Sequence, residues 1–352
     1  MEEKNLENFY LFFENKHRGS EQLIRKRLEF YEALLKCYRE FSENPVSLDI
    51  GSGRGEFLEE FTKNQFNAVG IEINDNFIDI ARKKGLTVIK EDALSFISRE
   101  SDNKYDVISM IHVIEHLNFE YVFKLFKEVF RILKPGGCFI LETPYTKNIV
   151  LGTYNFWLDP THIRPVNVDL VRALGEYIGF SYFEYFPLQS IELERINQIT
   201  LKHVFYAASP DISMVMIKDS ENKELIYKLL DELNKMKSKV SVDLDDLLEL
   251  YEKQIENEVA GIAELKNIID LQRDKINEIS AHLNALLNSK IWRFYGKLSK
   301  IKKTIFNNLK SLKKLYKRSA ITEETFSEKN FSLNKEELTY YKRLKLFTEK
   351  WK

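Results

Sequence analysis

The stretch VSLDIGSGRGEF (residues 46–57) decides the fold of this chain. An apolar run, VSLDI, leads directly into three glycines, Gly51, Gly53 and Gly55, and a helical pattern follows them. Glycine tolerates left-handed backbone angles and lets a ligand approach the main chain closely. A strand, a glycine-rich turn and a helix in succession predict a ligand site at the carboxyl end of the first strand of an open α/β sheet.

Short apolar runs alternate with helical stretches as far as residue 218. The expected strands are 46–50, 67–73, 86–91, 105–111 and 138–143, and helices such as 75–85 and 119–133 lie between them. Continuously apolar strands separated by helices predict a mostly parallel sheet covered on both faces. A later pair, 181–188 and 212–218, is expected at the edge of the sheet. The prediction is a Rossmann-like, doubly wound, mostly parallel sheet of seven strands.

The residues around the glycines favour one class of ligand. Glu72 ends the second strand, 21 residues after Gly51, where a carboxylate can accept hydrogen bonds from a ribose diol. The loop is G-x-G-x-G, whereas dinucleotide folds use G-x-G-x-x-G. Asp49 precedes it and suits a cationic sulfonium and amino group better than a pyrophosphate. After the third strand, Asp92 and the Ala93 amide are placed to read an adenine edge.

The motif HVIEH (112–116) has the H-x-x-E-H spacing of a class of zinc peptidases. Such a peptidase needs both histidines on one long helix. Here the motif directly follows the expected strand YDVISMI (105–111), so a helix cannot begin before it. We therefore place the motif in the turn at the mouth of the ligand crevice and exclude the peptidase.

Five segments together resemble the successive motifs of class I S-adenosylmethionine-dependent methyltransferases. In chain order they are VSLDIGSGRGEF, GIEIN, EDAL, YDVISMIHVIEHL and RILKPGGCFILETP. The resemblance implies S-adenosylmethionine as cofactor, with Gly51 and Gly53 beside its methionine part, Glu72 on the ribose and Asp92 on the adenine. We expect His112 against the cofactor and His116 facing the acceptor as a general base, since a neutral imidazole titrates near working pH.

Two alternatives for this turn stay open. Related methyltransferases with E-x-x-E-H here can coordinate a divalent metal, which would involve Glu115 and His116. A histidine, His112, stands in place of the first glutamate, which reduces the acidic charge that Mg²⁺ requires, so we expect no metal. The other alternative gives His116 no catalytic role, as a helix-start histidine bonded to the backbone.

Two flanking segments are expected to complete the site. Residues 9–31 place aromatic side chains beside a basic helix and suit a lid, with Tyr10, Arg18 and Arg27 as candidate cofactor contacts; an amphipathic helix packed on the sheet is the alternative. FWLDPTHIRP (156–165) follows the fifth strand. Asp159 and His162 are expected to orient and deprotonate a hydroxyl. Arg164 is expected to contact an anionic group, and the Trp157 ring is expected to stack on a sugar. A Pro-bounded structural loop is the alternative.

FYLFFENKHRGS (9–20) and FWLDPTHIRP together resemble a narrower family, the methyltransferases that terminate bacterial O-antigen polysaccharides. That resemblance implies O-methylation of a sugar hydroxyl at the end of a cell-surface glycan or glycolipid, beside a partner glycosyltransferase. The sequence lacks the kinase motifs that some terminators carry, so we expect direct methylation. The alternatives are a small phenolic or lipid acceptor, or an inactive scaffold or length ruler in glycan assembly.

The amino-acid composition of the chain changes after residue 219, where glycine becomes rare and proline is absent. An almost unbroken apolar heptad predicts a coiled coil and therefore a homo-oligomer. Its positions are Leu244, Leu248, Tyr251, Ile255, Glu258, Ile262, Leu265, Ile269, Gln272, Ile276, Ile279, Leu283 and Leu286. A helical hairpin folding back on the first domain is the alternative. We thus expect a lid (1–43), a methyltransferase domain (44–218) and a coiled coil (219–287).

Residues 288–319 contain no acidic side chain and alternate lysines and arginines with apolar residues at helical spacing. Such a basic amphipathic helix suits an anionic membrane surface; a partner protein or RNA is the alternative. A tail (320–352) follows. The net charge of −1 argues against nucleic acid as a partner of the whole chain. We predict a cytoplasmic protein, because the chain starts with the acidic residues MEEK, contains only two cysteines and has no long apolar run. The basic segment 288–319 predicts a peripheral position at the inner membrane.

Overall fold

The computed structural model describes residues 9, 11–13, 16–17, 21–189, 198–237, 242–288, 303 and 305–311. The chain divides into two compact units, Met1–Gly261 and Ile262–Lys352. Of the predicted features, Tyr10, Arg18 and most of the basic segment 288–319 lie outside the described residues.

Seven strands form one sheet in the first unit, in the order β3-β2-β1-β4-β5-β7-β6. Their bounds are β1 Val46–Ile50, β2 Asn67–Glu72, β3 Val88–Lys90, β4 Tyr105–Ile111, β5 Leu133–Pro144, β6 Tyr182–Leu188 and β7 Asp211–Ile217. The first five strands are parallel, and β7 runs antiparallel to both β5 and β6. The predicted seven-stranded, mostly parallel, doubly wound sheet is confirmed.

Apolar side chains alternate between the two faces of the sheet, because successive residues of a strand point to opposite sides. Phe139 and Leu141 of β5 belong to one core, and Cys138 and Ile140 belong to the other. Each core is closed by its own layer of helices, which explains why the strands read as continuous apolar runs.

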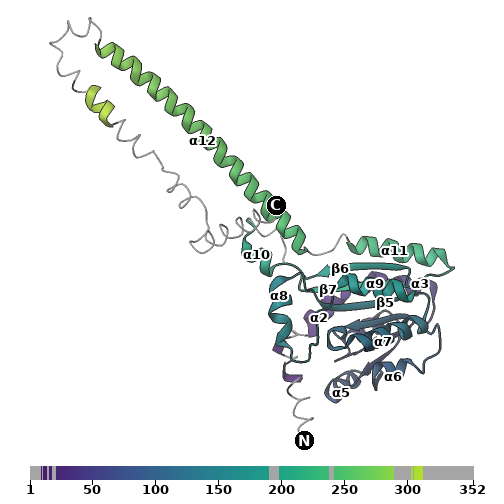
Figure 1. Cartoon of the computed structure of the whole chain (residues 1–352). Helices are drawn as coiled ribbons and strands as arrows, with labels where there is room; N and C mark the ends of the chain where they lie inside the picture. Colours follow the sequence, from purple (N-terminus) through teal and green to yellow (C-terminus); the bar gives the residue numbers. More distant parts are fainter. Residues whose placement is uncertain are drawn as a thin grey trace. The chain divides into compact units, whose positions relative to one another are not determined.

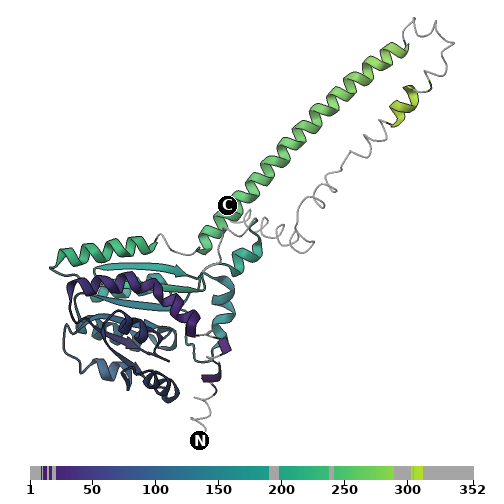
Figure 2. The ribbon, with the colours of Figure 1, turned by 180° about the vertical axis from the view of Figure 1, so that it is seen from behind.

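The two helical layers lie on opposite faces of the sheet, as Figures 1 and 2 show from opposite sides. One layer consists of α2 Glu21–Leu28, η1 Glu29–Tyr31, α3 Glu32–Phe41, α4 Glu56–Lys63, α5 Asp75–Lys83 and α11 Lys223–Lys237. The other consists of α6 Ala93–Ile97, α7 Phe119–Ile132 and α9 Val168–Ile178. Short elements at the carboxyl ends of the strands are η2 Ile114–His116, α8 Ile149–Thr153, η3 Asn155–Leu158 and α10 Leu201–Tyr206.

A 45-residue helix, α12, runs from Leu244 to Asn288. Its first turns pack within the first unit, where Leu247 is buried against Ile199, Val204 and neighbouring residues. Lys147 and Tyr145, which follow β5, both donate hydrogen bonds to Asp243 just before the helix. Hydrogen bonds therefore hold the start of α12 against the segment that follows β5.

In the second unit, α12 exposes a row of large apolar side chains. Five of them occupy positions of the predicted heptad: Leu265, Ile269, Ile276, Ile279 and Leu286. The coiled coil and the homo-oligomer stay predictions, and exposure of this row is what they require. Among the described residues, no helix combines the length and the apolarity needed to cross a membrane.

Truncation of Phe126 tests the core on the α7 side of the sheet. Its side chain is fully buried and meets Phe139 edge to face, with ring centroids 5.2 Å apart. Phe126→Ala is expected to lower the free energy of unfolding by about 3–5 kcal/mol, through lost burial and a cavity. Tyr227→Ala, whose ring is 75% exposed on α11, is the control and should change it by less than about 0.5 kcal/mol. Denaturant unfolding followed by circular dichroism measures both, and equal effects would contradict the assigned core.

Candidate functional site

A cavity of about 640 Å³ lies at the carboxyl ends of the central strands. Its lining includes the glycine loop after β1, the end of β2, the HVIEH turn after β4, Glu142 and Pro144 of β5, and, from the segment after β5, Asn155, Leu158, Asp159, Thr161 and His162. Open α/β sheets bind their ligands at this edge, where neighbouring helices and loops diverge. The cavity therefore collects in one place the motifs that the sequence distributes over more than a hundred residues.

The glycine loop forms the wall of the cavity after β1. Gly51, Gly53 and Gly55 all have positive φ angles, of 68°, 51° and 86°, a region that favours glycine. The Gly51 and Ser52 amides donate to the Ile71 carbonyl of β2. A Cβ at Gly51 would lie 2.4 Å from a methyl carbon of Val113. The loop thus passes too close to the HVIEH turn for any side chain at this glycine.

Two acidic residues border this loop as predicted. The Glu72 carboxylate accepts hydrogen bonds from the amides of Gly53, Ile73 and Asn74 at 2.8–2.9 Å. Asp49 is buried and accepts a hydrogen bond from the Ser109 hydroxyl at 2.7 Å. Both carboxylates line the cavity. They give its floor near the glycines a negative charge, which suits a cationic ligand that carries hydroxyl groups.

The predicted adenine contacts lie elsewhere. Asp92 caps the N-terminus of α6 by accepting a hydrogen bond from the Ser95 amide, and it also accepts one from the Tyr121 hydroxyl at 2.6 Å. Neither Asp92 nor Ala93 is among the described residues that line the cavity. Their role in binding adenine stays a prediction, and both carboxylate oxygens of Asp92 already have protein donors.

The N-terminal segment reaches the same cavity. Phe13, His17, Ile24, Arg27 and Leu28 contribute to its lining. The rings of Phe13 and His17 lie 4.7 Å apart. Arg27, one of three predicted cofactor contacts in this segment, is therefore in position, whereas Tyr10 and Arg18 lie outside the described residues. α2 packs on the sheet through Ile24 and Leu28, as the amphipathic-helix alternative requires, and the lid stays a prediction.

His112 occupies a charged pocket beneath the cavity, in the left-handed backbone region with φ 54°. Its Nδ1 is 3.4 Å from Glu115 Oε1 and its Nε2 is 3.8 Å from Asp211 Oδ1. Burial alone would lower the pKa of His112, but Glu115, Asp211 and Glu142 outweigh it and raise the pKa to about 9. The imidazole is therefore a cation at neutral pH, held among carboxylates.

The sequence did not single out three members of this pocket, namely Tyr31, Glu142 and Asp211. The Tyr31 hydroxyl donates to the Glu142 carboxylate, and both residues are buried. Burial raises the pKa of Glu142, and raises that of Tyr31 well above its ordinary value. The signal that would have found Glu142 and Asp211 is an ionisable residue inside or beside an otherwise apolar strand.

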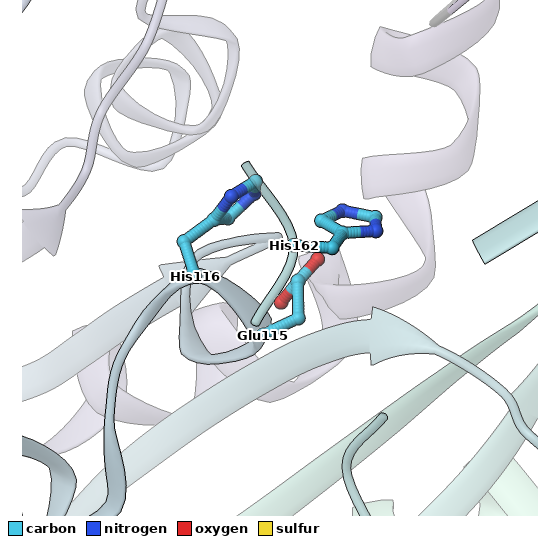
Figure 3. A group of neighbouring side chains, drawn as sticks. All are labelled: Glu115, His116 and His162. Atoms are coloured by element: carbon cyan, nitrogen blue, oxygen red, sulfur yellow. The ribbon is translucent and has the colours of Figure 1, made fainter. Parts of the chain in front are cut away.

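A second polar cluster faces the cavity from the other side of the HVIEH turn. It contains Glu115, His116 and His162, each with a possible ligand atom within 4.8 Å of the others (Figure 3). The rings of His116 and His162 lie 4.7 Å apart. Asp159 is buried and accepts hydrogen bonds from the amide and hydroxyl of Thr161. The three predicted catalytic residues, His116, His162 and Asp159, are therefore brought together.

The two predicted substrate contacts point elsewhere. The Trp157 side chain is 55% exposed, and the Arg164 guanidinium lies 5.0 Å from the centre of the Phe119 ring. Neither is among the described residues that line the cavity, whereas their neighbours Asn155, Leu158 and Thr161 are. A role for Trp157 or Arg164 in binding an extended acceptor stays a prediction.

Comparison with known proteins agrees with this architecture. A family model described as a methyltransferase domain matches residues 17–185. Phosphoethanolamine N-methyltransferase 1 of Triticum aestivum is 28% identical over 124 residues, which are 33% of this chain and 24% of that protein. The phosphoethanolamine N-methyltransferase of Plasmodium falciparum is 32% identical over 108 residues, 29% of this chain and 40% of that protein. The matched region thus spans less than half of either relative.

A solved structure matches more of the fold. The crystal structure of a S-adenosylmethionine-dependent methyltransferase from Archaeoglobus fulgidus aligns with a TM-score of 0.53 and 27% identity, over 60% of this chain and 100% of that chain. Residues 17–185 therefore form a S-adenosylmethionine-dependent methyltransferase domain.

Proposed function

We propose that this enzyme methylates a sugar hydroxyl of a cell-surface polysaccharide and thereby terminates the growing chain. The observation that carries the proposal is the polar cluster of His116, His162, Asp159 and Thr161, which lines the same cavity as the glycine loop and Glu72. A hydroxyl acceptor must lose its proton when it is methylated, and side chains of this kind serve that need.

The cavity fits S-adenosylmethionine through groups that belong to the chain. Gly51 and Gly53 line the cavity without any side chain, the Glu72 carboxylate suits a ribose diol, and Asp49 suits a positive charge. When bound, the cofactor supplies an electrophilic methyl group on a sulfonium. The residues that line the cavity then have to hold the acceptor in line and exclude water, which supplies much of the rate of such a transfer.

The acceptor end of the cavity favours a polar substrate. His162 directs Nδ1 at the Phe156 carbonyl, 2.6 Å away, so that Nδ1 carries the proton and Nε2 carries a lone pair. Burial lowers the pKa of His116, which keeps its ring neutral near pH 7. Asn155 and Thr161 add further hydrogen-bonding groups. A phenol or a lipid would call for a more apolar lining at this end.

The regions outside the sheet support a polysaccharide acceptor. Segments 9–20 and 156–165 resemble the corresponding segments of the O-antigen terminators. A long helix with an exposed apolar row is suited to joining copies of the chain and spacing them from a membrane-bound glycosyltransferase. Residues 288–319, with their basic charge, are proposed to contact that partner or the anionic inner membrane surface.

A second candidate acceptor is the amine of a phosphorylated small molecule. The names of the two curated relatives favour it, and the Asp211 carboxylate in the cavity wall is suited to a cation. Against it, His112 already places a positive charge beside that carboxylate.

An acceptor panel tests the proposal. The full-length protein is incubated with S-adenosylmethionine labelled in the methyl group and with lipid-linked O-polysaccharide intermediates, phosphoethanolamine, a catechol and RNA. The expected result is label on the glycan, at the terminal sugar, with unlabelled phosphoethanolamine. Label on phosphoethanolamine, the catechol or RNA and none on the glycan would overturn the glycan acceptor.

Glu72→Gln tests the cofactor end of the cavity. An amide cannot accept the three backbone hydrogen bonds and the ribose hydroxyls as a carboxylate does, and a hydrogen bond to a charged group contributes about 1.5–3 kcal/mol. We expect the dissociation constant of S-adenosylmethionine to rise by roughly 10- to 100-fold in calorimetry. The control is Glu91→Gln, at the end of the neighbouring strand, where the carboxylate pairs with Arg99. Loss of binding in the control, with Glu72→Gln unaffected, would contradict the assignment.

A further inference from the structure

We propose that Glu115, His116 and His162 hold a divalent transition-metal ion at the acceptor end of the cavity. Among the described residues, these side chains each offer one ligand atom, and the three atoms lie within 4.8 Å of one another. Figure 3 shows the three side chains as neighbours, with the Glu115 carboxylate directed toward His162. Two imidazoles and one carboxylate form a donor set found in zinc and non-haem iron sites.

The backbone fixes the distance between the two segments. Glu115 and His116 lie in η2, directly after β4, whereas His162 lies in the loop after η3. The Ile163 amide donates to the Glu115 carbonyl at 2.9 Å, which joins the loop to the turn next to the proposed ligands. The three donors are therefore held by main-chain contacts, as a preformed metal site requires.

Both imidazoles are oriented by hydrogen bonds of the kind that accompany metal ligation. The Phe156 carbonyl can only accept, so His162 donates from Nδ1 and its Nε2 is available as a ligand. Thr161 donates its hydroxyl proton to Asp159 at 2.6 Å, so the same oxygen accepts from Nδ1 of His116 at 2.8 Å. Again Nε2 carries the lone pair. Metal-bound histidines usually have such an oxygen partner on their other nitrogen.

The Glu115 carboxylate supplies an independent observation. The residue is 0% exposed, and its Oε2 accepts a hydrogen bond from the Thr143 hydroxyl at 3.1 Å. Its Oε1 has no hydrogen-bond partner among the described residues, and Nδ1 of His112 is 3.4 Å away. This oxygen thus faces the His112 cation but receives no hydrogen bond within the usual geometry, so it can accept a further ligand. A metal ion on the cavity side of the carboxylate would be such a ligand.

The donor set indicates which ion binds and what it does. Nitrogen ligands favour Zn²⁺, Co²⁺, Fe²⁺ or Mn²⁺ over Mg²⁺, which prefers oxygen. All three side chains line the cavity, so open coordination positions would face the acceptor. A metal ion lowers the pKa of a hydroxyl that binds to it, and the Asp159 carboxylate, with Oδ2 4.0 Å from His162 Nε2, is placed to take the released proton. This role rests on the proposed hydroxyl acceptor, whereas binding of the metal does not.

Metal binding is tested on the full-length protein after removal of metal with a chelator. Zn²⁺ is added, excess is removed, and bound zinc is measured by elemental mass spectrometry; Co²⁺ in its place is followed by its visible absorption. We expect one ion per chain. His116→Ala and His162→Ala should each weaken binding by more than about 100-fold, because loss of a supporting group alone costs roughly 10- to 100-fold. Thr161→Val removes only the hydroxyl that supports His116, so it should weaken metal binding by roughly 10- to 100-fold.

His282→Ala is the matched control, because this histidine is exposed on α12 and is not among the described residues that line the cavity; the variant should bind the metal as the wild type does. Circular dichroism and S-adenosylmethionine binding confirm that each variant is folded. Absence of bound metal in the wild type, or equal binding in the wild type and both histidine variants, would overturn the metal site. Methyl transfer to glycan that persists in the metal-free enzyme would overturn the role of the ion in lowering the pKa of the acceptor, and would leave the proposed function intact. One bound ion without any glycan methylation would support the metal site and count against the acceptor.

Discussion

The Glu72 carboxylate is the constraint on which the site depends. It accepts hydrogen bonds from three backbone amides, one in the glycine loop and two in the turn that opens α5. These bonds join the chain ends of two neighbouring parallel strands, β1 and β2. The glycine loop can therefore keep its left-handed backbone and its close contact with Val113. The same carboxylate lines the cavity, where we propose that it binds the ribose of the cofactor, so one residue would serve both folding and recognition.

A second constraint acts at the ends of β4, β5 and β7, where five ionisable groups lie among apolar side chains. His112 is held as a cation between Glu115 and Asp211, while burial favours the protonated form of Glu142 beside Tyr31. Separating any of these groups from its partners would leave an unpaired charge in a region of low dielectric. The pocket thus fixes the direction in which the HVIEH turn leaves the sheet. That direction in turn places His116 toward the cavity.

The sequence predicted the elements whose residue pattern is local. The bounds of β1 and β4 are those expected, because each is a continuous apolar run ended by a turn. β5 begins five residues before the expected start, at Leu133, because Leu133 already pairs with Tyr105 of β4; the register then shifts, and regular pairing resumes at Cys138. The glycine loop and Glu72 were found because their spacing along the chain is regular.

A local residue pattern could not predict the contacts between segments that are distant in the sequence. His116 and His162 were each identified as candidates, but their meeting depends on the backbone bond from Ile163 to Glu115, which no spacing reveals. Glu142 and Asp211 were missed because their neighbours make them part of a strand. Trp157 and Arg164 have the residue types expected of a sugar site, yet the local backbone turns them away from the cavity.

The central claim is that a single cavity at the carboxyl edge of the sheet binds the cofactor. Hydrogen–deuterium exchange of the full-length protein, with and without S-adenosylmethionine, tests it most directly because amides report where a ligand is held. We predict that the cofactor slows exchange in residues 49–57, 72–77 and 111–117. The account would be contradicted if these segments exchanged unchanged while slowing appeared at the opposite end of the strands, in residues 102–106 and 133–137.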